Sequence, residues 1–156
     1  MLTVRRQCDY AARILLHLAM QPPGTHLTAR EIARLRLMPP ALTRRVVAQL
    51  VAAGFLQSRR GKGGGFALAR SPAEISLLEV VEAMDGPIAL NRCTLDPQEC
   101  PLMPQCSVHE AWVDARRLLR DYLNLLTFRE LARRGQTLLA SSPGSPPTPG
   151  SGRSSP

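Results

Sequence analysis

Residues 55–70, FLQSRRGKGGGFALAR, constrain the fold more than any other part of this sequence. Two short segments, FLQSR at 55–59 and FALA at 66–69, flank the glycine-rich run GKGGG. The pattern predicts two paired strands with a basic tip, because glycine adopts the backbone conformations that a tight turn requires. A nucleotide-binding phosphate loop is disfavoured, since neither a Gly-Lys-Ser/Thr sequence nor a helix follows the glycines.

Two short helices joined by a tight turn are predicted directly before this hairpin. A capping box of Thr28 and Glu31 begins the first helix. The second helix spans about 41–53 and ends before Gly54, a typical residue after a helix C-terminus. Three of its polar residues are expected on its outer face: Thr43, Arg44 and Arg45. A hairpin after such a helix pair is a wing, so residues 1–72 are predicted to form a winged helix-turn-helix domain.

Helical periodicity predicts a mainly α-helical fold around this one small β-hairpin wing. Residues 9–20 place apolar side chains on one helical face, with Asp9 as the N-cap. A connecting helix is predicted within 73–90, and a long dimerisation helix followed by a short last helix within 109–134. The long helix has apolar residues at the spacing of a coiled-coil seam: Trp112, Leu119, Tyr122 and Leu126. Residues 135–156 are rich in Ser, Pro and Gly, and are predicted to form a disordered tail.

The net charge of +8 is distributed unevenly along the chain. Residues 1–72 contain twelve Lys or Arg and two acidic residues, whereas residues 73–108 contain one Arg and six acidic residues. A basic first half predicts a polyanionic partner such as double-stranded DNA. The sequence offers neither a membrane span nor a signal peptide, so we expect a cytoplasmic protein with no membrane partner. Clustered cysteines in that reducing compartment indicate metal binding more often than disulfides.

Three of the four cysteines fall in a loop predicted over 91–108, directly before the long helix. Together with a histidine they give the pattern Cys93-x6-Cys100-x5-Cys106-x2-His109. Thiolates bind zinc, copper(I) and iron–sulfur clusters well, but structural zinc sites usually contain closer Cys-x(2–4)-Cys pairs. The wider spacing suits a cluster and leaves zinc as an alternative. The remaining interpretation is that the three cysteines are unrelated and bind no common metal.

Taken together, these segments resemble the iron–sulfur winged-helix regulators typified by IscR and NsrR. The matching pieces occur in the family's order over residues 1 to about 134: DYAARILLHLA, LTAREIA, SRRGKGGGFALAR, ISLLEVVEAMDGP, the cysteine loop and LTFREL. Each helix alone would be a weak signal. The wing followed by the cysteine loop is the specific part of the resemblance.

The resemblance implies a homodimeric bacterial transcription regulator, with repression the expected mode, that senses redox conditions, nitric oxide or iron status. Three residues match the family's cysteine ligands by position: Cys93, Cys100 and Cys106. His109 matches the fourth ligand of IscR-like members, which hold a 2Fe–2S cluster. Asp9 matches the ligand that NsrR-like members supply from the other protomer to a 4Fe–4S cluster, and Cys8 is a third candidate. The 2Fe–2S cluster with His109 is the favoured prediction.

The same resemblance places the second helix of the helix-turn-helix in the major groove of a pseudo-palindromic operator, and the wing against the backbone and the minor groove. The residues expected to contact DNA are Thr43, Arg44, Arg45, Ser58, Arg60 and Lys62. The alternative function is a cluster-free winged-helix regulator with a zinc-binding or thiol-switch loop. An enzyme is disfavoured, because the sequence has no Cys-x-x-Cys, catalytic triad or nucleotide loop.

Overall fold

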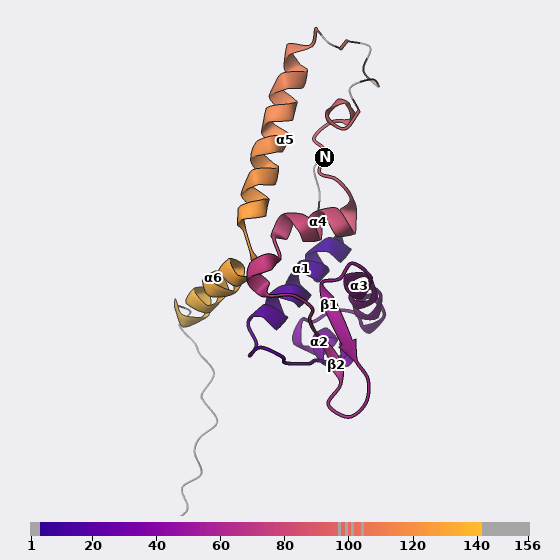
Figure 1. Ribbon diagram of the computed structural model, residues 1–156, viewed down its shortest axis with the longest axis vertical. Coiled ribbons are helices and arrows are strands. Elements are labelled where there is room, and N and C mark those ends of the chain that lie inside the picture. Colours follow the sequence, from indigo (N-terminus) through magenta and orange to yellow (C-terminus); the bar gives the residue numbers. More distant parts are fainter. Residues whose placement is uncertain (1–3, 97, 99, 101, 104, 142–156) are drawn as a thin grey trace, which may run out of the picture.

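The computed structural model describes residues 4–96, 98, 100, 102, 103 and 105–141 (Figure 1). Its fold is mainly helical with one two-stranded antiparallel sheet, as predicted. The elements in chain order are α1 Arg6–Ala19, α2 Ala29–Leu35, α3 Pro40–Ala52, β1 Leu56–Arg59, β2 Gly65–Leu68, η1 Pro72–Glu74, α4 Leu77–Asp85, η2 Arg92–Thr94, α5 Ser107–Leu125 and α6 Phe128–Ser141. The predicted tail from residue 142 onward lies outside the described residues.

α1 begins at Arg6, one turn earlier than predicted. Arg5 is its N-cap, and the backbone N–H of Arg5 donates to Oδ2 of Asp85 at 3.0 Å. The prediction that Asp9 caps this helix is wrong. Asp9 lies inside the first turn, where its carboxylate pairs with Arg13 at 2.8 Å. The Asp85 carboxylate at the end of α4 therefore accepts a hydrogen bond from the N-cap of α1. This bond joins the first helix to the C-terminal half of the chain.

α2 and α3 form the predicted helix-turn-helix. The Thr28 hydroxyl accepts the Glu31 N–H, and the Glu31 carboxylate accepts the Thr28 N–H, so the predicted capping box is confirmed. α3 has Pro40 at its first position. Gly54 follows its C-cap with a φ of 77°, as predicted. In the turn between the helices, Leu37 has a φ of 51°, a left-handed conformation that leucine rarely adopts.

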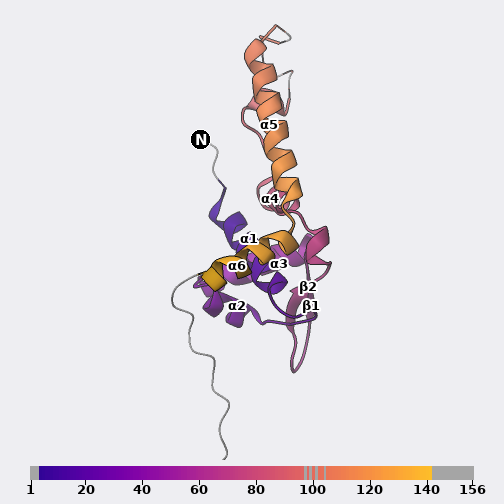
Figure 2. The same cartoon turned by 90° about the vertical axis from the view of Figure 1, so that its left-hand side faces the viewer.

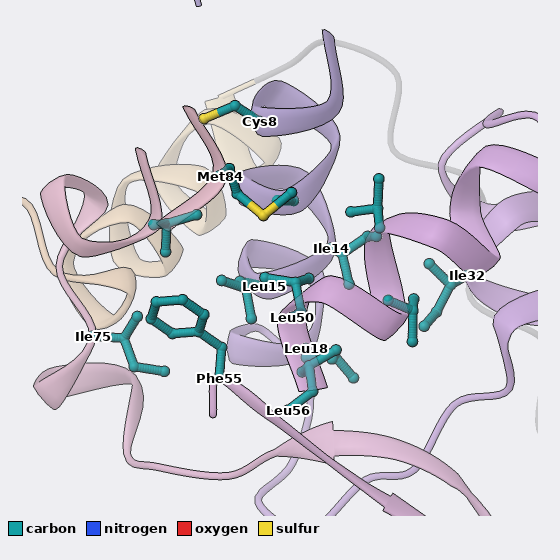
Figure 3. Close-up of a cluster of buried hydrophobic side chains, with 14 of the residues drawn as sticks. Cys8, Ile14, Leu15, Leu18, Ile32, Leu50, Phe55, Leu56, Ile75 and Met84 are labelled. Atoms are coloured by element: carbon teal, nitrogen blue, oxygen red, sulfur yellow. The ribbon is translucent and has the colours of Figure 1, made fainter. Parts of the chain in front are cut away.

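α1 lies at the centre of the hydrophobic core. Its apolar face is buried, and residues of α3, the hairpin and α4 pack against it. Figure 3 shows side chains from α1, α3 and the start of the hairpin pointing toward one another: Ile14, Leu15, Leu18, Leu50, Phe55 and Leu56. With only three Phe and one Trp in the chain, the core is largely aliphatic, as the composition requires. This packing fixes α3 and the hairpin relative to α1.

The C-terminal half begins with α4, whose capping box of Ser76 and Glu79 is present. α5 stands out from the body of the protomer, and its first turn lies at the opposite end from the wing (Figures 1 and 2). α6 then returns to the body. Phe128 at its start is fully buried, and its N–H donates to the carbonyl of Ile75 at 3.0 Å.

α6 is longer than predicted. It runs to Ser141 instead of ending at residue 134, so residues 135–141, expected within a disordered tail, are helical. At its start the Thr127 hydroxyl accepts the Glu130 N–H at 3.3 Å, while the Glu130 carboxylate binds two arginines of the next turn. Over the part of the chain that the structure describes, no helix combines the length and the apolar character needed to cross a membrane.

A contact between His17 and Arg36 ties the end of α1 to the turn of the helix-turn-helix. Nη2 of Arg36 lies 2.5 Å from Nδ1 of His17. Arginine can only donate, so Nδ1 is an unprotonated acceptor and the ring is neutral. Burial, and secondly the charge of Arg36, lower the pKa of His17 below its usual value.

We predict that His17 makes the stability depend on pH. The unfolded chain protonates His17 near pH 6.5, whereas the folded chain does so only at lower pH. The free energy of unfolding therefore falls as the pH drops through about 6.5. The variant His17→Gln keeps an acceptor that does not titrate, so it should lose less stability between about pH 7.5 and pH 5.5. Urea unfolding of both proteins measures the difference, and equal losses would contradict the prediction.

Candidate DNA-binding surface and cysteine loop

The outer face of α3 carries two of its three predicted DNA-contacting residues. Arg44 and Arg45 are exposed near the N-terminal end of the helix. The prediction for Thr43 is wrong, because Thr43 is fully buried and its hydroxyl donates to the carbonyl of Pro39 at 3.1 Å. It lies on the same helical face as the two buried valines one turn later. α3 thus presents two guanidinium groups, which match the paired acceptors of guanine.

The hairpin pairs as predicted, with Leu56 opposite Leu68 and Arg59 opposite Gly65. The polar and basic residues predicted to contact DNA are exposed: Ser58, Arg60 and Lys62. The segment before α2 joins the hairpin, since the Phe66 N–H donates to Leu27 at 2.8 Å and the Leu27 N–H donates back at 3.0 Å. These two bonds hold the base of the wing against the helix-turn-helix.

Two of the wing glycines are required by packing. A Cβ added at Gly64 would lie 2.3 Å from the carbonyl oxygen of Arg59. One added at Gly65, where φ is +142°, would lie 2.7 Å from the carbonyl of Leu27. Gly63 differs, because its φ of +72° is the only constraint and open space surrounds the Cβ position. The sequence indicated a turn but did not show that the glycines bring two backbones into contact.

We predict that Gly65→Ala destabilises the protein by about 1–3 kcal/mol, since the new Cβ must displace main chain at a strained φ. The matched control, Gly63→Ala, should cost about 1 kcal/mol from the backbone conformation alone. Denaturant unfolding of the two variants measures the difference. An equal or larger loss in Gly63→Ala would contradict the packing role of Gly65.

α2 adds two arginines that the sequence analysis did not single out. Arg30 and Arg34 are exposed, and with Met38 and Pro40 they line a hollow of 560 Å³ between α2 and the start of α3. Their i, i+4 spacing places them on one side of the helix, a signal that was present in the sequence. The sequence did not show that this side of α2 lies next to the start of α3. Three elements of the domain, α2, α3 and the wing, therefore carry exposed basic residues: Arg30, Arg34, Arg44, Arg45, Arg59, Arg60 and Lys62.

The three loop cysteines lie between α4 and α5. Cys93 is in the turn η2, Cys106 is the N-cap of α5, and Cys100 lies between them. All three are half-buried free thiols. Among the described residues, no three His, Cys, Asp or Glu side chains lie close enough together to hold one metal ion. The described loop thus supplies the right donor atoms for a thiophilic metal centre but holds them apart.

His109 lies in the first turn of α5, and its N–H donates to the carbonyl of Cys106 at 3.1 Å. Its Nδ1 is buried and has no hydrogen-bond partner among the described residues. A ring nitrogen removed from water normally meets a hydrogen-bond partner or a metal. The unpartnered atom therefore fits the ligand role predicted for His109.

The two other candidates for the fourth ligand are engaged elsewhere in the protomer. Asp9 pairs with Arg13 on α1. Cys8 is buried in the core with 1% of its surface exposed, and burial, then the charges of Asp85 and Asp9, raise its pKa to about 11. A thiol with so high a pKa is a poor source of thiolate. The local chemistry therefore favours His109 over both.

α5 leaves an apolar stripe uncovered along its length. Trp112 and Tyr122, predicted to lie at a dimer interface, are 41% and 55% exposed. Further large apolar side chains of α5 are exposed as well: Val108, Val113, Leu118 and Leu125. None of the residues of this helix is buried in the protomer.

The other two predicted interface residues face their own protomer. Leu119 is half-buried and, with Leu123, lines a groove of 990 Å³ between α1, α4 and α5. Leu126 is only 7% exposed, and its carbonyl accepts the Leu77 N–H at 2.8 Å. The placement of Leu126 on the dimer surface is wrong, because α5 ends at Leu125 and the chain turns into the core.

A winged helix-turn-helix joined to a protruding apolar helix by a thiol-bearing loop defines a class of transcription regulators. Residues 4–134 match the model of the Rrf2 family, described as "Iron-dependent Transcriptional regulator". The chain belongs to the Rrf2 family. Its relatives are transcriptional regulators and not enzymes, as the sequence predicted.

Individual relatives agree with this assignment. A putative HTH-type transcriptional regulator of Mycobacterium tuberculosis is 28% identical over 127 residues, which cover 81% of this chain and 78% of the relative. NsrR of Bacillus subtilis is 25% identical over 132 residues, covering 84% and 90%. The structure of CymR, the global cysteine regulator of B. subtilis, has a TM-score of 0.75 at 22% identity, covering 86% and 98%. T. potens IscR has a TM-score of 0.71 at 18% identity, covering 92% and 94%.

Proposed function

We propose that this Rrf2-family protein is a homodimeric repressor whose DNA affinity depends on the chemical state of its cysteine loop. The observation that carries the proposal is that the basic residues suited to DNA and the thiols suited to sensing lie in separate parts of the chain. Exposed arginines lie on α3 and the wing. The thiols belong to the loop that leads into α5, and the first turn of α5 lies at the opposite end from the wing (Figure 1). The first set suits DNA phosphates and bases, and the second suits a thiophilic metal centre or a thiol reaction.

Sequence reading is assigned to α3. Arg44 and Arg45 would enter the major groove, where an arginine bonds two acceptors of one guanine. The wing would contact the DNA backbone and the minor groove through three residues: Ser58, Arg60 and Lys62. Arg30 and Arg34 on α2 would contact phosphates, which adds affinity without sequence information.

The exposed stripe of α5 is assigned to a second copy of the chain. Trp112, Leu118 and Leu125 leave apolar surface in water, and a two-fold pair of α5 helices would cover it. The two wings and α3 helices would then read a pseudo-palindromic operator, with half-sites about 10 bp apart.

The cysteine loop is assigned to an iron–sulfur cluster, with 2Fe–2S favoured over 4Fe–4S. The ligands would be Cys93, Cys100, Cys106 and His109. The support is the thiol and imidazole donor set, the unpartnered Nδ1 of His109, relatives named NsrR and the structural neighbour IscR. When bound, the cluster would supply a centre sensitive to redox conditions, nitric oxide or iron status. Because the described residues are held apart, these side chains would have to close on it, and the loop would change shape.

The alternative is a cluster-free regulator whose loop binds zinc or acts as a thiol switch. The separation of the three thiols in the described residues favours the thiol switch, which needs no shared metal ion. So does the similarity to CymR, named a cysteine regulator in B. subtilis. CymR of Staphylococcus aureus was solved in an oxidized form, with a TM-score of 0.64 at 23% identity over 84% of this chain and 96% of that chain.

We predict that anaerobically purified protein is brown, absorbs visible light and contains iron and sulfide in about equal amounts. His109→Ala should shift the spectrum and lower the iron content, since it removes one ligand. Asp9→Ala should leave both unchanged. The matched control is His26→Ala, whose ring contacts the Gly24 carbonyl away from the loop. Colourless protein that contains zinc would contradict the cluster and support the alternative.

We predict that the arginines of α2 and α3 act differently on DNA. Arg30→Ala should lower the slope of log affinity against log salt by about 0.9, and weaken an operator and an unrelated duplex equally. Arg44→Ala should cost about 1–3 kcal/mol on the operator alone and relax its sequence preference. Fluorescence anisotropy on an operator selected from random duplexes measures both. A uniform loss over all sequences in Arg44→Ala would contradict its reading role.

A further inference from the structure

One arginine in the middle of α5 holds the chain on both sides of the first loop cysteine. Nε of Arg116 donates to the carbonyl of Ile88 at 2.7 Å, and its Nη1 donates to the carbonyl of Thr94 at 3.2 Å. Ile88 follows α4, and Thr94 directly follows Cys93. The part-buried guanidinium therefore fixes the segment that leads into the loop and the turn that contains Cys93 to the same point of α5.

Hydrogen bonds within the turn around Cys93 tie Thr94 and Leu95 to the residues just before the cysteine. The Thr94 side chain is buried, and its hydroxyl donates to the Asn91 carbonyl at 2.7 Å. The N–H of Thr94 donates to the same carbonyl at 3.1 Å, and the N–H of Leu95 donates to Arg92 at 2.9 Å. A displacement of Cys93 must therefore move the Thr94 carbonyl, which Arg116 binds.

The same contacts continue into α4. Oε1 of Glu82 accepts the Ile88 N–H at 3.4 Å and also receives Arg120 of α5. Ile88 is thus bonded through its N–H to α4 and through its carbonyl to α5. At the end of α4, Asp85 accepts the N–H of Arg5 at the start of α1, and α1 packs against α3. A continuous set of contacts joins the Cys93 turn to the recognition helix.

We propose that Arg116 is the positioning residue that couples the cysteine loop to α5 and α4, so that a chemical change at Cys93 alters the DNA affinity. The proposal rests on the proposed function in taking the loop as the sensor, but it holds for a cluster and for a thiol switch alike. A planar guanidinium donates in two directions at once. When the Cys93 turn shifts, Arg116 loses the Thr94 carbonyl, and the link between the loop and the two helices is released.

The test compares Arg116→Gln with a matched control, Arg117→Gln. Arg117 is the next residue on α5, its side chain is 68% exposed, and among the described residues it pairs with Asp114 of the same helix at 2.9 Å. In full-length, metal-free, reduced protein, Arg116→Gln should speed hydrogen exchange of the Ile88, Thr94 and Leu95 amides roughly tenfold, the effect of losing one or two hydrogen bonds. Hydrogen exchange in α1 and α3 should stay as in the wild type. In Arg117→Gln, exchange should match the wild type at all of these amides.

The second readout is the ratio of operator affinities between two states of the loop. The first state is reduced, metal-free protein. The second is protein reconstituted anaerobically with iron and sulfide or, if no cluster forms, protein oxidised with peroxide. We expect a ratio well away from one in the wild type and in Arg117→Gln, and a ratio near one in Arg116→Gln.

If Arg116→Gln shows the same ratio of operator affinities as the wild type, the coupling is overturned and the proposed function stays intact. If hydrogen exchange is faster in that variant while the ratio is unchanged, Arg116 only anchors the loop. Unchanged exchange in Arg116→Gln overturns the proposal at its first step. A wild-type ratio of one for both comparisons overturns the proposed switch and the coupling with it.

Discussion

The packing of α1 against α3, α4 and α6 is the interaction on which the rest of the structure depends. Ala11, Ile14 and Leu15 are fully buried on this helix. Each fully buried Ile or Leu contributes about 1.5–3 kcal/mol, more than a single exposed polar contact. Because α1 packs against both α3 and α4, the helix proposed to read DNA and the helix that leads to the cysteine loop share one core. Under the proposed function, a displacement of α4 would therefore be passed through α1 to α3.

The basic residues of α3 and the wing lie far from the cysteine loop. Under the proposed function, α1 is therefore important because it contacts both α3 and α4. The wing and the start of α5 lie at opposite ends of the described chain (Figures 1 and 2), so under the proposed function a signal from the cysteine loop would have to travel through the body of the molecule. Any influence must pass through elements with two possible arrangements. The polar contacts of Glu82, Ile88 and Arg116 lie between the loop and α4, and the bond of Asp85 to the start of α1 lies beyond it. In a dimer joined through α5, the same contacts would also carry a change to the second copy.

Features set by neighbouring residues could be predicted from the sequence, and features set by distant contacts could not. The capping box of Thr28 and the glycine stop at Gly54 follow from local hydrogen bonding and backbone freedom. Thr43 was misplaced because its polarity indicated the outer face, whereas the helical phase puts it in the core with its hydroxyl satisfied by the preceding turn. The packing role of Gly65 and the two carbonyls held by Arg116 depend on residues far away in sequence, which no local pattern reports. The cysteine pattern predicted thiol and imidazole donors for a thiophilic metal but left zinc and a cluster open, and it did not show that the described donors lie apart, because their separation depends on how α4, the loop and α5 pack.

Under the proposed function, the state of the cysteine loop sets the DNA affinity. The most direct measurement is the dissociation constant of one operator duplex, at fixed salt, for iron–sulfur-loaded and metal-free forms of the same wild-type preparation, with reduced and oxidised metal-free protein alongside. We predict that the dissociation constants of at least two of these states differ roughly fivefold or more, the usual scale of coupling between sites. Equal dissociation constants in all states would contradict it, and would leave a DNA-binding protein whose cysteine loop does not control that binding.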